Sequence, residues 1–178
     1  MRTIKIKERN IKTSKLLQLC KDKFPVYSYY SDKELDKQFP IPKILTEREF
    51  QDSVEPDPET LGKSTKEADP EMKGITLRER IIMELEYFER TGKHLDIKGI
   101  TFCSGSRNSD GDVPDACLGD GGRFEVDYVG IGNSDSGYGI RSAVNLLPSY
   151  LLTLDEAIKI CKDNGLKVTR LKTIEEEL

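Results

Sequence analysis

A glycine-rich segment at residues 99–145 constrains the fold of this chain more than any other feature. It holds ten of the fourteen glycines, and no lysine occurs from residue 99 to residue 158. Apolar residues alternate only briefly there, at Phe124, Val126 and Tyr128, between clusters of glycine, asparagine and aspartate. This pattern predicts short strands joined by wide polar turns. Because glycine costs stability wherever alanine would fit, the segment needs unusual backbone angles, presents a surface, or does both; we expect both.

The size and composition of the chain favour a single domain, residues 1–178, with a core of its own. Its 36% hydrophobic and 34% charged residues place it at the polar end of globular proteins. We expect a surface excursion at about 46–72, ordered only where it lies against the body or a neighbour. No run approaches eighteen apolar residues and the N-terminus does not resemble a signal peptide, so we expect no membrane span and a cytoplasmic or virion-associated protein.

Charge is distributed unevenly along the chain. Residues 1–24 carry eight basic and two acidic residues, whereas residues 103–142 carry seven acidic residues and three arginines. A basic N-terminal edge can touch nucleic acid, but runs of this size are more often solvated faces, so we do not expect nucleic-acid binding. The functional surface that we favour is mildly acidic, with a protein or another macromolecule as its ligand.

Cysteine and histidine are too few and too dispersed for a familiar zinc site. The cysteines are Cys20, Cys103, Cys117 and Cys161, and His94 is the only histidine. A Cys103–Cys117 bridge is one reading of the central loops, but a chain without a secretory signal favours reduced thiols. A lone histidine after a helix is more often a surface or capping residue than a catalytic base.

The sequence Asn108-x-Asp110-x-Asp112 has the spacing of a calcium loop. Val113 and Gly119 stand where that loop requires glycine and glutamate, so we interpret the acids as turn formers. We therefore expect no metal and no cofactor. The chain also lacks a Gly-x-Ser-x-Gly elbow and a phosphate-binding loop followed by Lys-Ser/Thr, which favours a protein that is not an enzyme.

The clearest helix is predicted at residues 76–92, between the capping box Thr76-Leu-Arg-Glu79 and Gly92. Its apolar stripe should dock on the main core and comprises Leu77, Ile81, Leu85 and Phe88, widened by Ile82 and Met83.

Periodicity predicts the remaining elements, and we expect the two terminal strands to pair in one sheet. In chain order these elements are a strand at 3–8, a helix at 15–23 capped by Ser14, an extended aromatic run at 24–30 that packs in the core rather than forming a stacking platform, a helix at 31–39, a helix at 154–163 and a strand at 166–174.

Two short motifs bound the central segment: Cys103-Ser-Gly105-Ser106-Arg107 and Gly139-Ile140-Arg141-Ser142-Ala143. They resemble the Arg-Gly-Gly-Ser and Gly-Phe-Arg-Val-Ala landmarks of the C-type-lectin-like domain shared by formylglycine-generating enzymes and the variable proteins of diversity-generating retroelements. Serine and cysteine stand in the first motif where arginine and glycine would be.

The resemblance implies an α+β, C-type-lectin-like fold with paired terminal strands, two main helices and a loop-rich second sheet that displays ligand-binding residues. Calcium-dependent sugar binding is not implied, because the chain has no tryptophan and lacks the lectin Trp-Asn-Asp signature. The catalytic cysteines of the formylglycine enzymes do not match Cys103 or Cys117. The variable-protein branch fits best, in which a rigid scaffold tolerates massive substitution at exposed positions.

The candidate ligand-binding residues lie in a displaying segment at about 103–143. Alternation along residues 123–128 sets the charged side chains on one face of a strand and the apolar ones on the other. The resemblance adds loop residues to that exposed surface, giving the set Asp115, Cys117, Asp120, Arg123, Glu125, Asp127, Asn133, Asp135, Ser136 and Tyr138. Arg107 and Arg141 are assigned to the scaffold, because a guanidinium has five donors that can tie loop carbonyls together.

Two other functions remain open: a viral or cellular structural protein that uses the same fold for assembly, and an enzyme. A neighbouring reverse transcriptase gene with an adenine-rich near-repeat of codons 105–141 would single out the display function. The ligand, the host and the oligomeric state are left open by the sequence.

Overall fold

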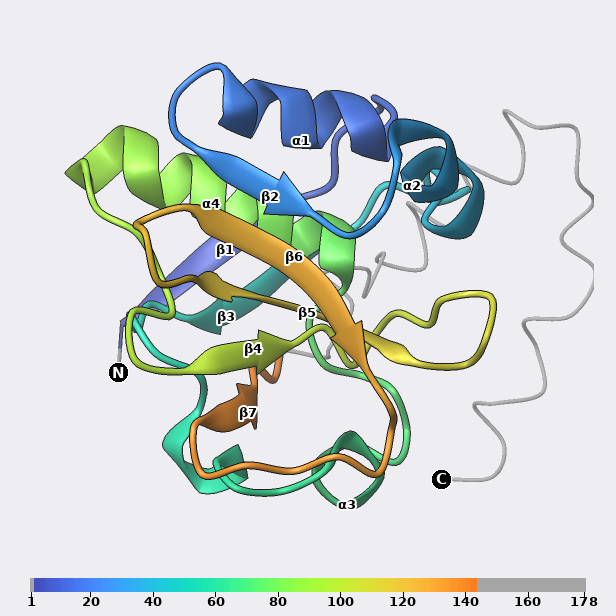
Figure 1. Ribbon diagram of the computed structural model, residues 1–178, viewed down its shortest axis with the longest axis vertical. Helices are drawn as coiled ribbons and strands as arrows, with labels where there is room; N and C mark the ends of the chain where they lie inside the picture. Colours follow the sequence, from blue (N-terminus) through green and yellow to red (C-terminus); the bar gives the residue numbers. More distant parts are fainter. Residues whose placement is uncertain (1, 144–178) are drawn as a thin grey trace, which may run out of the picture. The chain divides into compact units, whose positions relative to one another are not determined.

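The computed structural model describes residues 2–143 and has a mixed α+β fold with two sheets and several helices (Figure 1). The predicted helix at 154–163, the predicted strand at 166–174 and the pairing of the terminal strands fall outside the described residues. Among residues 2–143, no helix is both long enough and apolar enough to cross a membrane. In chain order the elements are β1 Thr3–Lys7, α1 Thr13–Lys21, β2 Val26–Ser28, α2 Asp32–Gln38, β3 Glu47–Gln51, η1 Pro58–Thr60, α3 Thr65–Ala68, α4 Leu77–Thr91, β4 Ile100–Phe102, β5 Val113–Leu118, β6 Phe124–Val129 and β7 Tyr138–Ile140.

The strands divide into a small sheet and a larger one. β1 and β3 form an antiparallel pair, and the other five strands form a sheet in the order β2-β6-β5-β4-β7. In the larger sheet β5 is antiparallel to both of its neighbours, whereas β2 and β7 join the edges in parallel. Helix α4 packs against α1, β1 and β5, so it lies between the two sheets in the middle of the core.

The segment at 46–72 is built into the fold rather than lying over it. Its first part is β3, which pairs with β1 so that Ile4 lies opposite the fully buried Phe50. Further along, Asp57, Thr60 and Thr65 are buried. The strand at 3–8 is therefore confirmed, and the segment 46–72 is ordered where it lies against the rest of the fold, in β3, η1 and α3. Phe50 is the only apolar residue of β3, which is why the sequence pattern did not reveal a strand.

Helix capping agrees with the sequence at two helices and differs at a third. Ser31 and Glu34 form the capping box of α2, as expected. Helix α1 begins before the predicted cap, at Thr13, so the assignment of Ser14 as N-cap is wrong. Ser14 instead donates from its backbone nitrogen to a carboxylate oxygen of Asp36 at 2.9 Å, which fastens α1 to α2.

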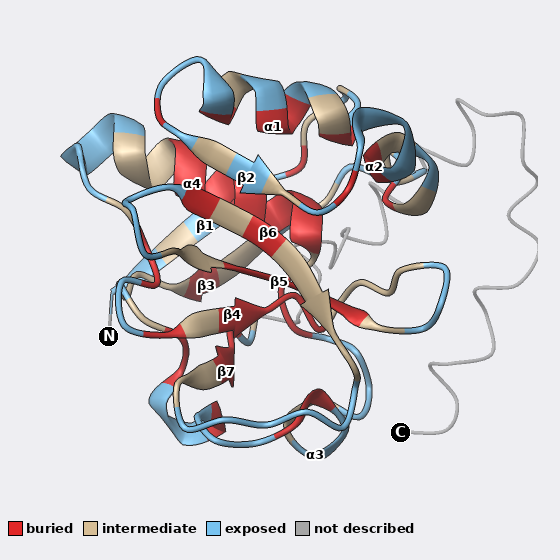
Figure 2. Cartoon of the chain, in the orientation of Figure 1, coloured by how far each residue is buried: buried red, intermediate tan, exposed pale blue. Residues whose placement is uncertain are grey.

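Helix α4 has the predicted ends and an unexpected interior. Thr76 and Glu79 form the capping box, and Gly92 ends the helix with φ of 66°, a left-handed conformation that suits glycine. The helix is buried all round from Leu77 to Leu85, including four charged residues, and amphipathic only beyond (Figure 2). The predicted stripe is thus confirmed, but the polar face opposite it is absent from the first half of the helix.

Only two of the four aromatic side chains at residues 24–30 are buried in the core. Phe24 and Tyr30 are buried, as expected, whereas Tyr27 is 41% exposed and Tyr29 is 54% exposed. β2 occupies the middle of this run and lies at the edge of the larger sheet. The two exposed tyrosines therefore stay available for contacts with other molecules.

Candidate functional site

The larger sheet has two different faces, as the alternation along residues 123–128 predicts. Phe124 and Val126 are fully buried in the main core, whereas Glu125 and Asp127, which alternate with them along β6, are half-buried. Asp115 lies directly opposite Asp127, and Cys117 lies opposite Glu125. Because directly opposed residues of paired strands point to the same side, these four side chains share one face.

Tyr138 lies on the same face, in strand β7 at the edge of the sheet. Its pKa is raised by burial and by the negative charges of Asp115 and Asp135, with a smaller contribution from Cys117. We call the group formed by Asp115, Cys117, Glu125, Asp127 and Tyr138 the display face. The structure brings together five of the ten candidate residues on it.

Asp115 differs from the expectation of an exposed ligand contact, because only 6% of the residue is exposed. Within residues 2–143, no hydrogen-bond donor contacts its carboxylate. Burial, together with the charge of Asp127, raises the pKa of Asp115 to about 7. Removal of a carboxyl group from water disfavours its charged form, which is why the pKa of Asp115 approaches neutral pH.

Cys117 is half-buried beside these acids and is a free thiol. Burial first, and then the charges of Asp115 and Glu125, raise its pKa to about 12. The thiol therefore stays protonated at neutral pH and is a poor nucleophile. Cys103 is also free, so the two residues do not form the bridge that the sequence left open.

Arg123 lies at the margin of the display face and is neutralised there. Its Nε donates to Glu125 Oε1 at 2.5 Å, and its guanidinium lies 5.1 Å from the centre of the Tyr27 ring. The other acids of the display face, Asp115 and Asp127, have no basic partner among the described residues. The face as a whole is therefore acidic.

The remaining candidates lie on two turns. Asp120 is exposed beside Gly121 and Gly122, whose positive φ angles of 141° and 70° make the tight turn between β5 and β6. Asn133, Asp135 and Ser136 are exposed in the connection from β6 to β7. Of these four residues, Asp135 is linked to the display face, because its backbone carbonyl accepts from the backbone nitrogen of Tyr138 at 2.9 Å.

The two arginines assigned to the scaffold both tie loops together. Arg107 donates from one nitrogen to the carbonyls of Ser104 and Ser106, at 2.8 and 2.7 Å. Arg141 is 1% exposed and donates to the carbonyls of Ser53 and Val54, at 3.0 and 2.8 Å. Arg141 thereby connects the end of β7 to the segment after β3.

Arg141 also belongs to a buried ion network that the sequence did not suggest. Its guanidinium pairs with Asp96, and Asp96 pairs with Arg80 of α4 at 2.8 Å. Arg80 pairs in turn with Glu84 at 2.8 Å, and Glu84 contacts His94 at 2.8 Å. Burial lowers the pKa of Arg80, but the charges of Asp96 and Glu84 outweigh it and raise the pKa. Two arginines and two carboxylates balance, so the network is neutral apart from His94.

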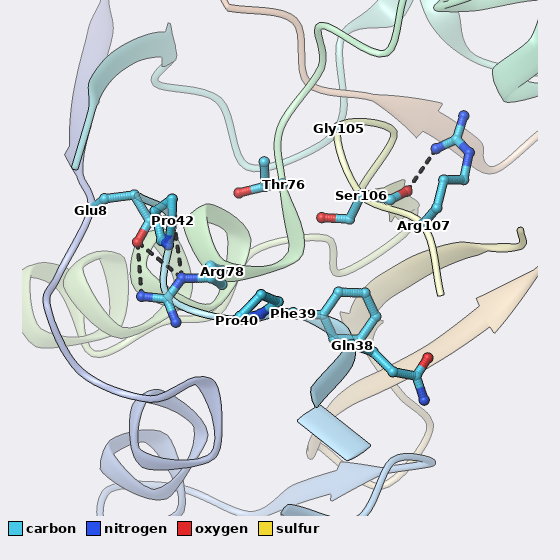
Figure 3. Close-up of a pocket in the computed structure, with 10 residues that line it drawn as sticks. All are labelled: Glu8, Gln38, Phe39, Pro40, Pro42, Thr76, Arg78, Gly105, Ser106 and Arg107. Carbon is cyan, nitrogen blue, oxygen red and sulfur yellow. Dashed lines mark hydrogen bonds and ion pairs between the residues drawn. The ribbon is translucent and has the colours of Figure 1, made fainter. Parts of the chain in front are cut away.

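A pocket of about 260 Å³ opens near the start of α4 (Figure 3). Glu8 and Arg78 pair at one end, and Arg107 lies at the other with Ser106. Arg78 uses its remaining donors on the carbonyls of Arg9 and Ile11 and on the hydroxyl of Thr13. The guanidinium of Arg78 is therefore fully engaged by contacts within the protein.

The turn at residues 108–112 is formed by Asn108, whereas the sequence predicted that its aspartates would form it. The side-chain oxygen of Asn108 accepts from the backbone nitrogens of Asp110 and Asp112, at 3.0 and 2.9 Å. The turn former is thus Asn108 rather than the aspartates. Nowhere in residues 2–143 does a group of three or more His, Cys, Asp or Glu side chains come together in a way that could hold a metal ion.

Comparison with family models, with curated proteins and with solved structures finds no match for this chain.

Proposed function

We propose that the protein is a ligand-binding display protein with a C-type-lectin-like fold, of the kind found among the variable proteins of diversity-generating retroelements. In this proposal the display face and its flanking loops contact a protein or another macromolecule. The positions on the loops tolerate extensive substitution.

One observation carries the proposal: the candidate side chains lie on the side of the larger sheet that faces away from the main core. Asp127 and Glu125 alternate with Val126, which is fully buried. The fold is held elsewhere, by α4 and by the network of Arg80 and Arg141. Substitution of the exposed loop residues Asp120, Asn133, Asp135 and Ser136 should therefore leave the packing and the buried ion pairs untouched. Tyr138 differs from them, because its ring also packs against the buried Phe102.

The charge of the display face defines the ligand further. Asp115 and Asp127 have no basic partner among the described residues, and the nearby Asp120 and Asp135 add negative charge. A complementary ligand surface is basic, since opposed charge speeds association and excludes acidic partners. Tyr138 would supply contact area at low entropic cost.

Tolerance to substitution can be measured directly. One library randomises Asp120, Asn133, Asp135 and Ser136, and a matched library randomises Leu77, Ile81, Ile82 and Leu85 of α4. Both are displayed on yeast and sorted for resistance to protease, which reports the folded fraction. We expect most members of the loop library and few members of the helix library to resist. Equal resistance in the two libraries would contradict the proposal.

The genomic locus separates display from assembly. A reverse transcriptase gene beside a near-repeat of codons 105–141, differing at adenines, would support the retroelement relationship. A locus of capsid or tail genes without such a repeat would favour the structural alternative.

A further inference from the structure

Three tyrosines surround a small cavity on the opposite side of β6 from the display face. The cavity measures about 130 Å³, and its walls include Tyr29, Tyr30 and Tyr128. Tyr128 follows Asp127 in β6, so the two side chains point to opposite faces of the sheet. The cavity is therefore separate from the display face.

The three rings form walls rather than a stack. Tyr29 and Tyr128 have ring centres 4.7 Å apart at 68°, and Tyr29 and Tyr30 have centres 5.7 Å apart at 88°. The hydroxyl of Tyr128 donates to that of Tyr29 at 3.4 Å, which joins the two outer rings. A flat base needs parallel faces on which to stack, so this arrangement suits a compact, rounded group instead.

The charge around the cavity has one sign. Glu34 and Asp110 line it, and none of the lysines or arginines in the described part of the chain does. Loop 108–112 is held over the cavity by Gln38, whose side-chain oxygen accepts from the backbone nitrogen of Ser109 at 3.0 Å. Aromatic faces beside carboxylates attract a cation.

Tyr30 lines the cavity with a buried side chain. Tyr30 is 5% exposed, and its hydroxyl has no hydrogen-bond partner among residues 2–143. Asn108, which also lines the cavity, lies near enough to the hydroxyl to lower its pKa, although burial outweighs this and raises it. The hydroxyl is buried away from the cavity, so Tyr30 contributes its ring, rather than its hydroxyl, to the cavity wall.

We propose that this cavity, the tyrosine cage, binds a methylated ammonium group, such as the head group of choline or of a methylated lysine. The size supports a head group rather than a whole cofactor, because drug-sized ligands occupy pockets of roughly 300 Å³ or more. Methylation suits the cage because a methylated ammonium is weakly hydrated and presents a rounded surface to the rings.

Titration with choline and with 3,3-dimethylbutan-1-ol, its neutral carbon counterpart, tests the proposal by NMR of the full chain. We expect choline to bind at least tenfold more tightly, because only choline gains from the ring faces and carboxylates. Equal binding of the two compounds, or no binding of choline, would overturn the proposal. A third probe, the amide of N-acetyl-trimethyllysine, distinguishes the sources: the tighter of the two cationic probes identifies the natural head group.

A pair of matched variants locates the site. Tyr29 and Tyr27 are both exposed and stand two residues apart, but only Tyr29 lines the cage. Tyr29→Ala should weaken choline binding about tenfold, and Tyr29→Phe should retain it, since the ring carries the contact. Tyr27→Ala should change it less than twofold. If Tyr27→Ala weakened binding as much as Tyr29→Ala, the cage would not be the site.

Discussion

The protein places charged side chains in two regions that obey opposite rules. In the buried ion network every charge has a partner: Arg80 contacts both Glu84 and Asp96, and Asp96 contacts Arg141. On the display face Asp115 is nearly as hidden but has no donor among the described residues. The ion network stabilises the fold, whereas the display face carries a carboxyl group without a basic partner, which a cationic ligand group would pair with.

A buried charged side chain has a structural role only where it also has partners of opposite charge. Burial of a charge alone does not distinguish a structural residue from a binding residue, because Arg80 and Asp115 are both more than nine-tenths buried. The number of partners does distinguish them. Removing a charge from the network should therefore destabilise the protein, and removing one from the display face should not.

The largest effect is expected for Arg80→Met, which leaves Glu84 and Asp96 buried with fewer partners. Breaking a buried pair in this way costs about 3–5 kcal/mol of unfolding free energy. The control is Arg90→Met on the same helix. Arg90 is exposed, forms an ion pair with Asp52 and lies over the ring of Tyr87, so its loss should cost less than about 1 kcal/mol. Urea titrations followed by circular dichroism measure both. Similar losses for the two variants would show that the network is not structural.

Leu85→Ala should have the next largest effect. Leu85 is 2% exposed in the core, so truncation should cost about 2–5 kcal/mol. Asp135→Tyr, on an exposed loop of the proposed ligand surface, should stay within about 0.5 kcal/mol of the unchanged protein. The same denaturant titration compares them. Equal losses would remove the distinction between scaffold and display surface.

Helix ends that depend on nearby residues could be predicted from the sequence. The capping boxes at Ser31 and Thr76 and the stop at Gly92 lie where expected, because each depends on residues within one turn. β3 was missed because its single apolar residue, Phe50, is specified by its partner β1 rather than by alternation.

The network was missed for the same reason. Arg80 and Glu84 at helical spacing look like an exposed pair, and only Asp96, which comes from the loop after α4, shows that they are buried. On the display face, the side of each residue of β6 followed from alternation. The burial of Asp115 did not, because it depends on neighbouring strands and loops brought together by the fold.

The smallest and most specific effect concerns Asp115. Burial raises the pKa of Asp115 from its ordinary value of 3.8 to about 7 in the folded protein, so only the folded state holds the proton between these pH values. Stability therefore falls as pH rises from about 4 to about 7 and then levels off. The shift sets an upper limit of about 4 kcal/mol. The partial solvent contact of the carboxylate makes about 1–2 kcal/mol the expected effect.

Asp115→Asn removes this dependence and isolates it. At pH 4.5 the variant and the unchanged protein should differ least, because the carboxyl of Asp115 has only begun to ionise in the unfolded chain and is still protonated in the folded state. At pH 8.5 the variant should be the more stable of the two by about 1–2 kcal/mol, since no buried charge forms. Asp120→Asn, at an exposed turn, should match the unchanged protein at both values. Denaturant titrations from pH 4.5 to 8.5 give the difference directly. A difference that stayed constant across this range, or that favoured Asp115 at high pH, would mean that its carboxylate has a partner and that the display face lacks the unpaired charge on which a basic ligand would depend.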